Sequence, residues 1–148
     1  MSGEFIDTNV FVYLFDETDD RKRIKAKEIV RAALETRSAR ISHQVVQETL
    51  NVVTRKLPTP MTVEKARQFL EQVLMPLWQI MPSPVLYRRG LEIQARYGFS
   101  FYDSLIVAAA LESGCNRLFS EDMQHGQHVE GLTIENPFKD IVDRQPAG

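Results

Sequence analysis

The chain is poor in cysteine and histidine and carries little net charge, and each shortage excludes a class of protein. Its single cysteine, Cys115, cannot form an internal disulfide. With that cysteine and only three histidines, no spacing resembles a zinc site. The net charge is −2 and the isoelectric point is near 5.9, so the overall charge does not indicate a nucleic-acid-binding protein. Any such binding must depend on local basic patches.

Long apolar runs are also missing. No run approaches the roughly 20 residues that span a bilayer, and the first five residues lack the basic and apolar regions of a signal peptide. We therefore expect a cytoplasmic protein that does not enter a membrane. Hydrophobic residues make up 43% and charged residues 26% of the 148 residues, as in ordinary globular proteins. We expect a single domain over residues 1–138 and a flexible C-terminal tail over 139–148.

Short strands alternate with helices along most of the chain. The pattern predicts strands at residues 4–7, 39–42, 77–81, 117–120 and 132–135, and helices at 10–15, 21–35, 43–56, 62–76, 84–97 and 102–111. Such alternation is typical of an α/β fold whose central, mainly parallel sheet is covered by helices on both faces.

Four acidic residues stand at distinctive places in this pattern. Asp7 follows the first strand, Glu48 lies in the helix after the second, Asp103 lies in the first turn of an apolar helix, and Asp122 comes just after a later strand. Three of them have an ordinary structural explanation. Asp7 and Asp103 are suited to helix capping, the latter in a Ser100-x-x-Asp103 pattern, and Glu48 is suited to a solvated helix face.

The positions of these four acids together favour a different interpretation. In a parallel sheet, the ends of strands and the starts of the following helices lie at one edge, so the four side chains can converge there. Converging carboxylates repel one another unless a cation neutralises them. Carboxylate oxygens and water suit Mg²⁺ or Mn²⁺. The pattern therefore predicts a site for a divalent metal ion.

Several short motifs, in their order and spacing, resemble those of the PIN-domain nucleases, and within them the VapC-type toxins of toxin–antitoxin pairs. The matching stretches are Phe5-Ile6-Asp7-Thr8-Asn9, Ile41-Ser42 followed by Gln47-Glu48, Phe101-Tyr102-Asp103-Ser104, and Leu118-Phe119-Ser120-Glu121-Asp122. The resemblance extends from Phe5 to about Phe138. It implies a three-layer α/β/α sandwich and metal-dependent cleavage of RNA.

The resemblance also implies roles for individual residues. The four catalytic acids of the family correspond to Asp7, Glu48, Asp103 and Asp122. We expect Asp7 and Asp103 to bind Mg²⁺, or Mn²⁺ in its place, with Glu48 and Asp122 binding directly or through water. Neighbouring polar residues that would orient these groups are Thr8, Asn9 and Ser120. The adjacent acids Glu121 and Asp122 leave an ambiguity of one residue, and the family pattern favours Asp122.

The expected partners are an RNA substrate, an antitoxin protein and a second copy of the chain in a homodimer. An anionic metal site needs a basic rim to bind RNA. Two basic patches offer candidates for RNA binding, namely Arg21, Lys22 and Arg23 in one and Arg88 and Arg89 in the other. Taken alone, either patch is more typical of a solvated helix face than of RNA binding.

Two other functional classes fit parts of the same sequence. The chain could be a PIN-like binding module in which the acids are caps and the helices at 21–34 and 63–74 form a groove for a partner. It could also be an aspartate-based phosphotransferase. A haloacid-dehalogenase-like phosphatase would have a second aspartate where Asn9 stands, and a phospho-receiver domain would have a late lysine, yet no lysine occurs between Lys65 and Lys139. Both phosphotransferases are therefore disfavoured.

Overall fold

The computed structural model describes residues 3–141. Its strands are β1 (Glu4–Ile6), β2 (Ala39–Ser42), β3 (Trp78–Ile80), β4 (Arg117–Phe119), β5 (His128–Val129) and β6 (Leu132–Glu135). Its helices are α1 (Thr8–Tyr13), α2 (Asp20–Thr36), α3 (His43–Arg55), α4 (Val63–Phe69), the π-helix η1 (Leu70–Leu74), α5 (Met75–Leu77), α6 (Pro84–Tyr97) and α7 (Phe101–Glu112).

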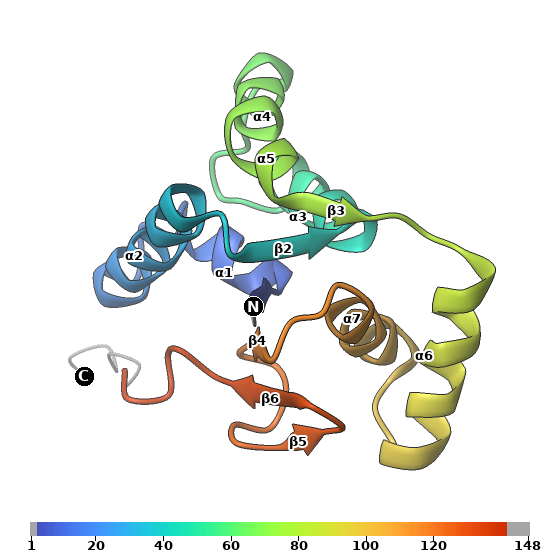
Figure 1. The fold of residues 1–148 in the computed structure, drawn as a ribbon. Helices are drawn as coiled ribbons and strands as arrows, with labels where there is room; N and C mark the ends of the chain where they lie inside the picture. The colour runs from blue at the N-terminus through green and yellow to red at the C-terminus, as the bar shows by residue number, and fades with distance from the viewer. Residues whose placement is uncertain (1–2, 142–148) are drawn as a thin grey trace.

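The strands form one sheet in the order β3-β2-β1-β4-β6-β5. All neighbouring pairs are parallel except β5 with β6. Helix α2 lies on one side of the sheet, and α6 and α7 lie on the other (Figure 1). The predicted α/β fold with a mainly parallel sheet is therefore confirmed. The short strand β5 was not predicted, because two residues are too few to show an alternating pattern.

The centre of the sheet is buried on both faces. Phe5 and Ile6 of β1 and Leu118 of β4 are completely inaccessible to solvent. Helix α7 is buried from Ser104 to Ala110, as its almost uniformly apolar sequence predicts. It packs closely against α6 at Gly90, where an added Cβ would lie 2.7 Å from a methyl carbon of Leu105. The absence of a side chain at this position lets the two helices approach each other.

The helix boundaries follow the capping signals in the sequence. The hydroxyl groups of Ser42, Thr62, Ser83 and Ser100 each accept a hydrogen bond from a backbone N–H in the first turn of the following helix. The predicted helix at 62–76 forms as three consecutive segments, α4, η1 and α5. Because Pro76 has no N–H to donate, the regular bonding pattern is interrupted beside it, and the chain widens into the π-helix.

The end of the chain bears on the predicted domain boundary. Phe138 is buried, and Ile141 packs against the same core. The predicted flexible tail at 139–148 falls mostly on residues 142–148, which lie outside the described residues. Within residues 3–141, no helix is long and apolar enough to cross a membrane.

Candidate active site

The carboxyl ends of β1, β2 and β4 border one open cavity of about 480 Å³. All four predicted acids line it, together with Thr8 and Asn9 from the start of α1. The acids are Asp7, Glu48, Asp103 and Asp122. β1 lies between β2 and β4, so the chain leaves the central strand in one direction and later returns on its other side. Such a switch point is where open α/β sheets usually bind ligands.

Asp7 is the most buried of the four acids, with 5% of its surface exposed. Its backbone N–H donates to the carbonyl of Phe119 at 3.0 Å, which joins the ends of β1 and β4. One carboxylate oxygen accepts from the N–H of Thr8 at 2.7 Å, and the other accepts from Ser120 Oγ at 2.8 Å. Asp7 therefore caps α1, as the structural interpretation expected, and lines the cavity as well.

The pKa of the Asp7 carboxyl is raised from 3.8 to about 7, and burial is the largest cause. The hydrogen bonds from Ser120 and Thr8 lower the pKa, and the charges of Glu48 and Asp122 contribute to the net increase. Asp7 is thus held by neutral donors and repelled by neighbouring acids. A nearby cation would relieve both the burial cost and the repulsion.

Glu48 is held at both of its carboxylate oxygens. Oε2 accepts from the hydroxyl of Thr8 at 2.8 Å, and Oε1 accepts from the side-chain amide of Gln44 at 2.9 Å. The same Gln44 amide lies 3.2 Å from the carbonyl of Tyr102, beside Asp103. Gln44 therefore joins the starts of α3 and α7. It was not among the predicted site residues, although its spacing of four from Glu48 places both on one helix face.

Asp103 combines a helix-start position with a place in the cavity wall. Its backbone N–H donates to the hydroxyl of Ser100 at 3.1 Å, so the predicted cap is present. Its carboxyl lines the cavity and is partly buried. Burial raises the pKa of this carboxyl, as do the charges of Asp122 and Glu48, whereas Ser100 lowers it. The cap accounts for the backbone of Asp103, whereas the raised pKa of its carboxyl reflects mainly burial in the cavity wall, with a smaller contribution from the neighbouring acids.

The adjacent acids Glu121 and Asp122 have different surroundings. Asp122 lines the cavity and accepts from the side-chain amide of Asn9 at 3.2 Å. Glu121 instead binds the ammonium of Lys22 at 3.1 Å and accepts from the hydroxyl of Tyr13. In space, the fourth acid of the cavity is therefore Asp122.

The predicted supporting residues each contact at least one acid. Thr8 bonds to two of them, Ser120 to Asp7, and Asn9 to Asp122. Ser120 also accepts from the backbone N–H of Asp122 at 3.3 Å. These contacts fix the directions of carboxylates that come from distant parts of the chain.

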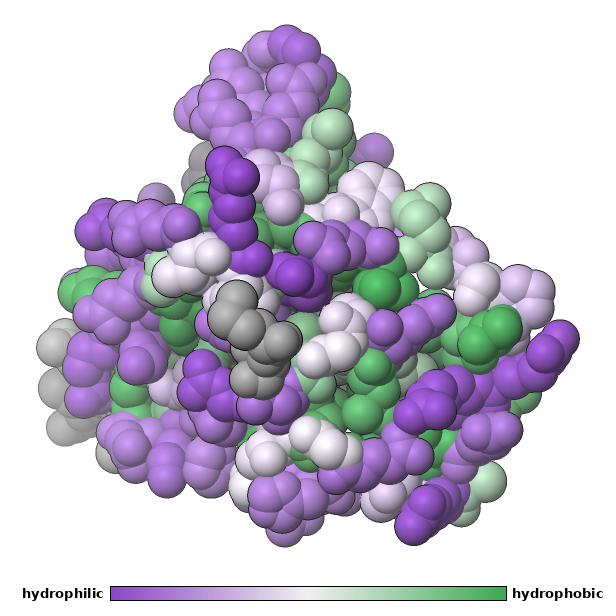
Figure 2. All heavy atoms as spheres, viewed as in Figure 1, coloured by the Kyte–Doolittle hydropathy of each residue, from purple (hydrophilic) through white to green (hydrophobic). Residues whose placement is uncertain are grey.

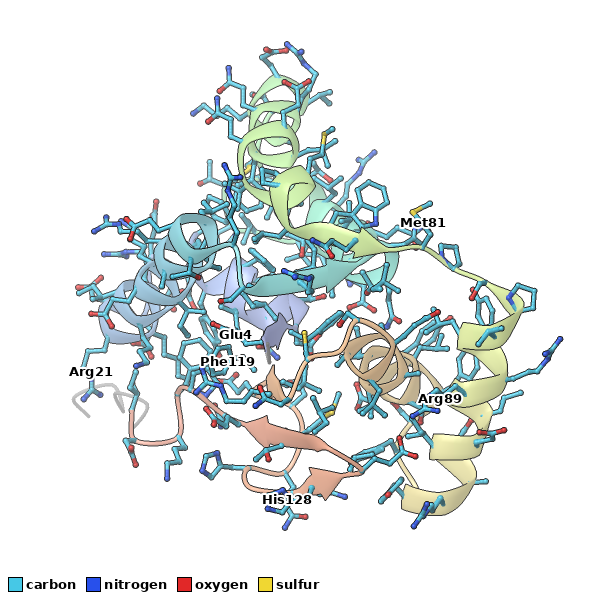
Figure 3. The ribbon with its side chains drawn as sticks, in the orientation of Figure 1. Glu4, Arg21, Met81, Arg89, Phe119 and His128 are labelled. Atoms are coloured by element: carbon cyan, nitrogen blue, oxygen red, sulfur yellow. The ribbon has the colours of Figure 1, made fainter. Side chains whose placement is uncertain are left out.

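The five basic residues predicted to bind RNA lie outside the cavity. Lys22 is buried in its ion pair with Glu121, Arg23 pairs with Asp20 at 2.8 Å, and Arg89 pairs with Glu130. Arg21 and Arg88 are exposed. Arg21 on α2 and Arg89 on α6 lie at opposite sides of the molecule (Figure 3), so the two patches do not form one continuous rim.

The donor set of the cavity fits a hydrated divalent cation. Four carboxylates line it, and neutral groups rather than cations satisfy three of them. Among residues 3–141, no three acid, histidine or cysteine side chains lie close enough to ligate one ion directly. Mg²⁺ usually keeps several waters and takes one or two carboxylates from a protein.

Comparison with known proteins identifies the family. Residues 5–128 match the PIN domain. A search of curated proteins gives no significant match. Among solved structures, a toxin–antitoxin complex from Klebsiella pneumoniae is 18% identical with a TM-score of 0.64, covering 91% of this chain and 98% of its own.

Two further structures share the fold. The toxin VapC20 of Mycobacterium tuberculosis, described as cleaving the sarcin–ricin loop, is 20% identical with a TM-score of 0.58 and covers 81% of this chain and 92% of its own. VapBC2 of Rickettsia felis, bound to a promoter DNA fragment, is 18% identical with a TM-score of 0.63 and covers 89% of this chain and 96% of its own. With the family match over most of its length, the chain belongs to the PIN-domain family and has the fold of VapC-type toxins.

Proposed function

We propose that this PIN domain is a metal-dependent ribonuclease that hydrolyses phosphodiester bonds of RNA and acts as the toxin of a toxin–antitoxin pair. The observation that carries the proposal is that four carboxylates, from four separate parts of the chain, line one cavity, and that within residues 3–141 none of them forms an ion pair. A protein that used these acids only as caps would have no need to bring them together.

Mg²⁺, or Mn²⁺ in its place, is the cofactor in this proposal. Asp7 and Asp103 would be its main ligands, and Glu48 and Asp122 would bind it directly or through water. When bound, the ion supplies activation of water and relief of negative charge on the phosphate. The fit of the donor set to a hydrated cation supports this assignment.

The residues of the chain position the reacting groups. Thr8 and Gln44 hold both oxygens of Glu48, and Ser120 holds Asp7, so the carboxylates are oriented before substrate arrives. Water attacks the phosphorus, and a carboxylate oxygen of the cavity accepts its proton. The bond between phosphorus and one ribose oxygen breaks with its electron pair on that oxygen, which then takes up a proton from solvent. Because its pKa is near 7, Asp7 is only partly ionised at neutral pH in the metal-free protein.

An antitoxin partner and a homodimer belong to the same proposal. Two structural neighbours are a toxin–antitoxin complex and a VapBC pair. The chain also exposes large apolar side chains between β3 and the middle of α6, among them Met81 at 58%, Val85 at 59% and Leu91 at 55%. Met81 is labelled in Figure 3, and apolar surface is visible in the same region of Figure 2. Such surface is suited to contact with another protein chain.

The test is cleavage of single-stranded and structured RNA by purified protein with Mg²⁺, with Mn²⁺ and with excess chelator. We expect cleavage only with metal, and its loss in Asp7→Asn. The control is Asp20→Asn, which changes an exposed acid outside the cavity and should cleave like the original protein. Full activity of a folded Asp7→Asn protein would refute the proposal. A folded original protein that cleaves no RNA with either metal would favour the alternative, a PIN-like binding module without catalysis.

A further inference from the structure

RNA cleavage at this cavity poses an electrostatic problem. The substrate carries a negative charge on every phosphate, and four carboxylates line the place where it must bind. One divalent ion does not cancel that charge. Phosphates that flank the cleaved one therefore need a positive group close to the acids.

The basic residues predicted from the sequence do not supply this group at the cavity. Lys22, Arg23 and Arg89 direct their charges to acidic side chains of the protein. The α2 patch and the α6 patch lie on opposite sides of the molecule (Figure 3). Neither patch contributes a residue to the cavity lining.

Lys56 is the basic side chain that does line the cavity. It follows the last residue of α3, and its backbone N–H caps that helix by donating to the carbonyl of Val52 at 2.8 Å. Its side chain is exposed and has no hydrogen-bond or ion-pair partner among residues 3–141. The ammonium group is therefore available to a ligand.

The position of Lys56 follows from the periodicity of α3. Gln44, Glu48, Val52 and Lys56 are spaced four residues apart, and all four line the cavity. At 1.5 Å per residue, Lys56 lies about 12 Å along the helix from Glu48. That separation is too large for a role at the acids themselves, and it suits contact with a phosphate farther along the same RNA strand.

We propose that Lys56 binds a backbone phosphate of single-stranded RNA next to the cleaved one and so sets the path of the strand across the cavity. This inference rests on the proposed ribonuclease function. It assigns Lys56 to substrate binding and not to metal binding. An acidic segment of a partner protein is the competing ligand, and the test separates the two.

The test measures both binding and cleavage. A fluorescent single-stranded RNA oligonucleotide is bound to Asp7→Asn protein with and without Lys56→Ala, at several salt concentrations. One lost phosphate contact should weaken binding about three- to tenfold and lower the slope of log affinity against log salt by about 0.7. In the protein with Asp7 intact, Lys56→Ala should raise KM by a similar factor with little change in kcat.

Two variants serve as controls. Lys56→Arg keeps the charge and should restore the affinity and the salt slope. Lys65→Ala removes an exposed lysine outside the active-site cavity and should change neither. Stabilisation by Mg²⁺, measured as a shift in Tm, should be equal in Lys56→Ala and the original protein.

The outcomes distinguish this inference from the function on which it rests. Unchanged RNA affinity and salt slope in Lys56→Ala, with cleavage intact in the original protein, would overturn the Lys56 assignment alone and leave a partner protein as its ligand. RNA binding that depends on Lys56 without any cleavage would support the assignment and refute the nuclease. Failure of the original protein both to bind and to cleave RNA would refute both.

Discussion

Glu121 and the four acids that line the cavity differ in whether the protein provides them with a positively charged partner. Glu121 receives a buried ammonium from Lys22, 3.1 Å away, and a hydroxyl from Tyr13. One residue later, Asp122 lines the cavity, where it, Asp7 and Glu48 accept hydrogen bonds from neutral side chains. The two acids are adjacent in the sequence, yet one is neutralised by the protein and the other is not.

The difference indicates what each group is for. Glu121 links α2 to the segment after β4, and the fold supplies its counter-ion because the contact is permanent. The carboxylate cluster, by which we mean Asp7, Glu48, Asp103 and Asp122, forms no ion pair with any basic residue in the described part of the chain. For Asp7, a pKa raised from 3.8 to about 7 corresponds to a cost on the order of 4 kcal/mol for the ionised form. Such a cost at a cavity is typical of a functional site, and the proposed cation would offset it.

The largest expected effect is on RNA cleavage by variants at Asp103 and at its helix cap, Ser100, which distinguish a role in metal binding from a role in capping. Asp103→Asn should reduce RNA cleavage by at least about a thousandfold, because a cavity carboxylate is lost. Ser100→Ala should cost about 1 kcal/mol of stability through the lost cap and reduce cleavage only several-fold. Initial rates at saturating Mg²⁺, with denaturation curves for both variants, measure the two effects. Equal loss of activity in the two variants would reduce Asp103 to a capping residue.

The next effect is a dependence of stability on pH in the metal-free protein. Because the folded state raises the pKa of Asp7, it binds more protons than the unfolded state between about pH 4 and 7. The free energy of unfolding should therefore decrease as the pH rises from about 4 to 7, by up to about 4 kcal/mol from the Asp7 carboxyl. Asp7→Asn should remove most of the fall and be the more stable protein at pH 8. Urea denaturation from pH 4 to 8 in chelator tests this, and parallel curves for both proteins would contradict it.

For Glu121, removal of its positively charged partner Lys22 should destabilise the fold. Lys22→Met leaves the Glu121 carboxylate without its ion pair and should cost about 2–3 kcal/mol, somewhat less than a fully buried pair because Glu121 is partly exposed. The double variant Lys22→Met with Glu121→Gln should recover most of this loss. Free energies of unfolding from urea curves measure both. A double variant as unstable as the single one would show that Lys22 acts through other contacts.

The smallest expected effects compare the adjacent acids directly. Asp122→Asn should reduce cleavage about tenfold, because it removes one charge from the cavity while keeping the hydrogen-bonding shape. Glu121→Gln should leave the rate within about threefold. Rates at limiting Mg²⁺ are the most sensitive measurement. The reverse order would place Glu121 in the site and Asp122 outside it.

Much of the fold was predictable because its elements are signalled locally. The cap residues Ser42, Ser83 and Ser100 and the terminating Gly98 mark helix boundaries that the structure confirms. The π-helix η1 was not predictable, because nothing in the pattern of Leu70–Leu74 distinguishes it from an α-helix; the nearest signal is Pro76 in α5, which lacks an N–H.

The site was predictable only in part. The four acids could be placed at one sheet edge because strand ends converge there. Lys22, in contrast, looked like a surface cation, since nothing near it in the sequence reveals Glu121, which is 99 residues away. Lys56 was overlooked because its part in the cavity depends on which face of α3 turns toward the acids.

Metal binding tests the central claim most directly, namely that the cluster and not Glu121 is kept for a cation. Mn²⁺ or Mg²⁺ is titrated calorimetrically into the original protein, Asp7→Asn and Glu121→Gln, all at pH 8. We predict saturable binding to the original protein and to Glu121→Gln, and its loss in Asp7→Asn. Equal binding to all three proteins, or to none of them, would contradict the account.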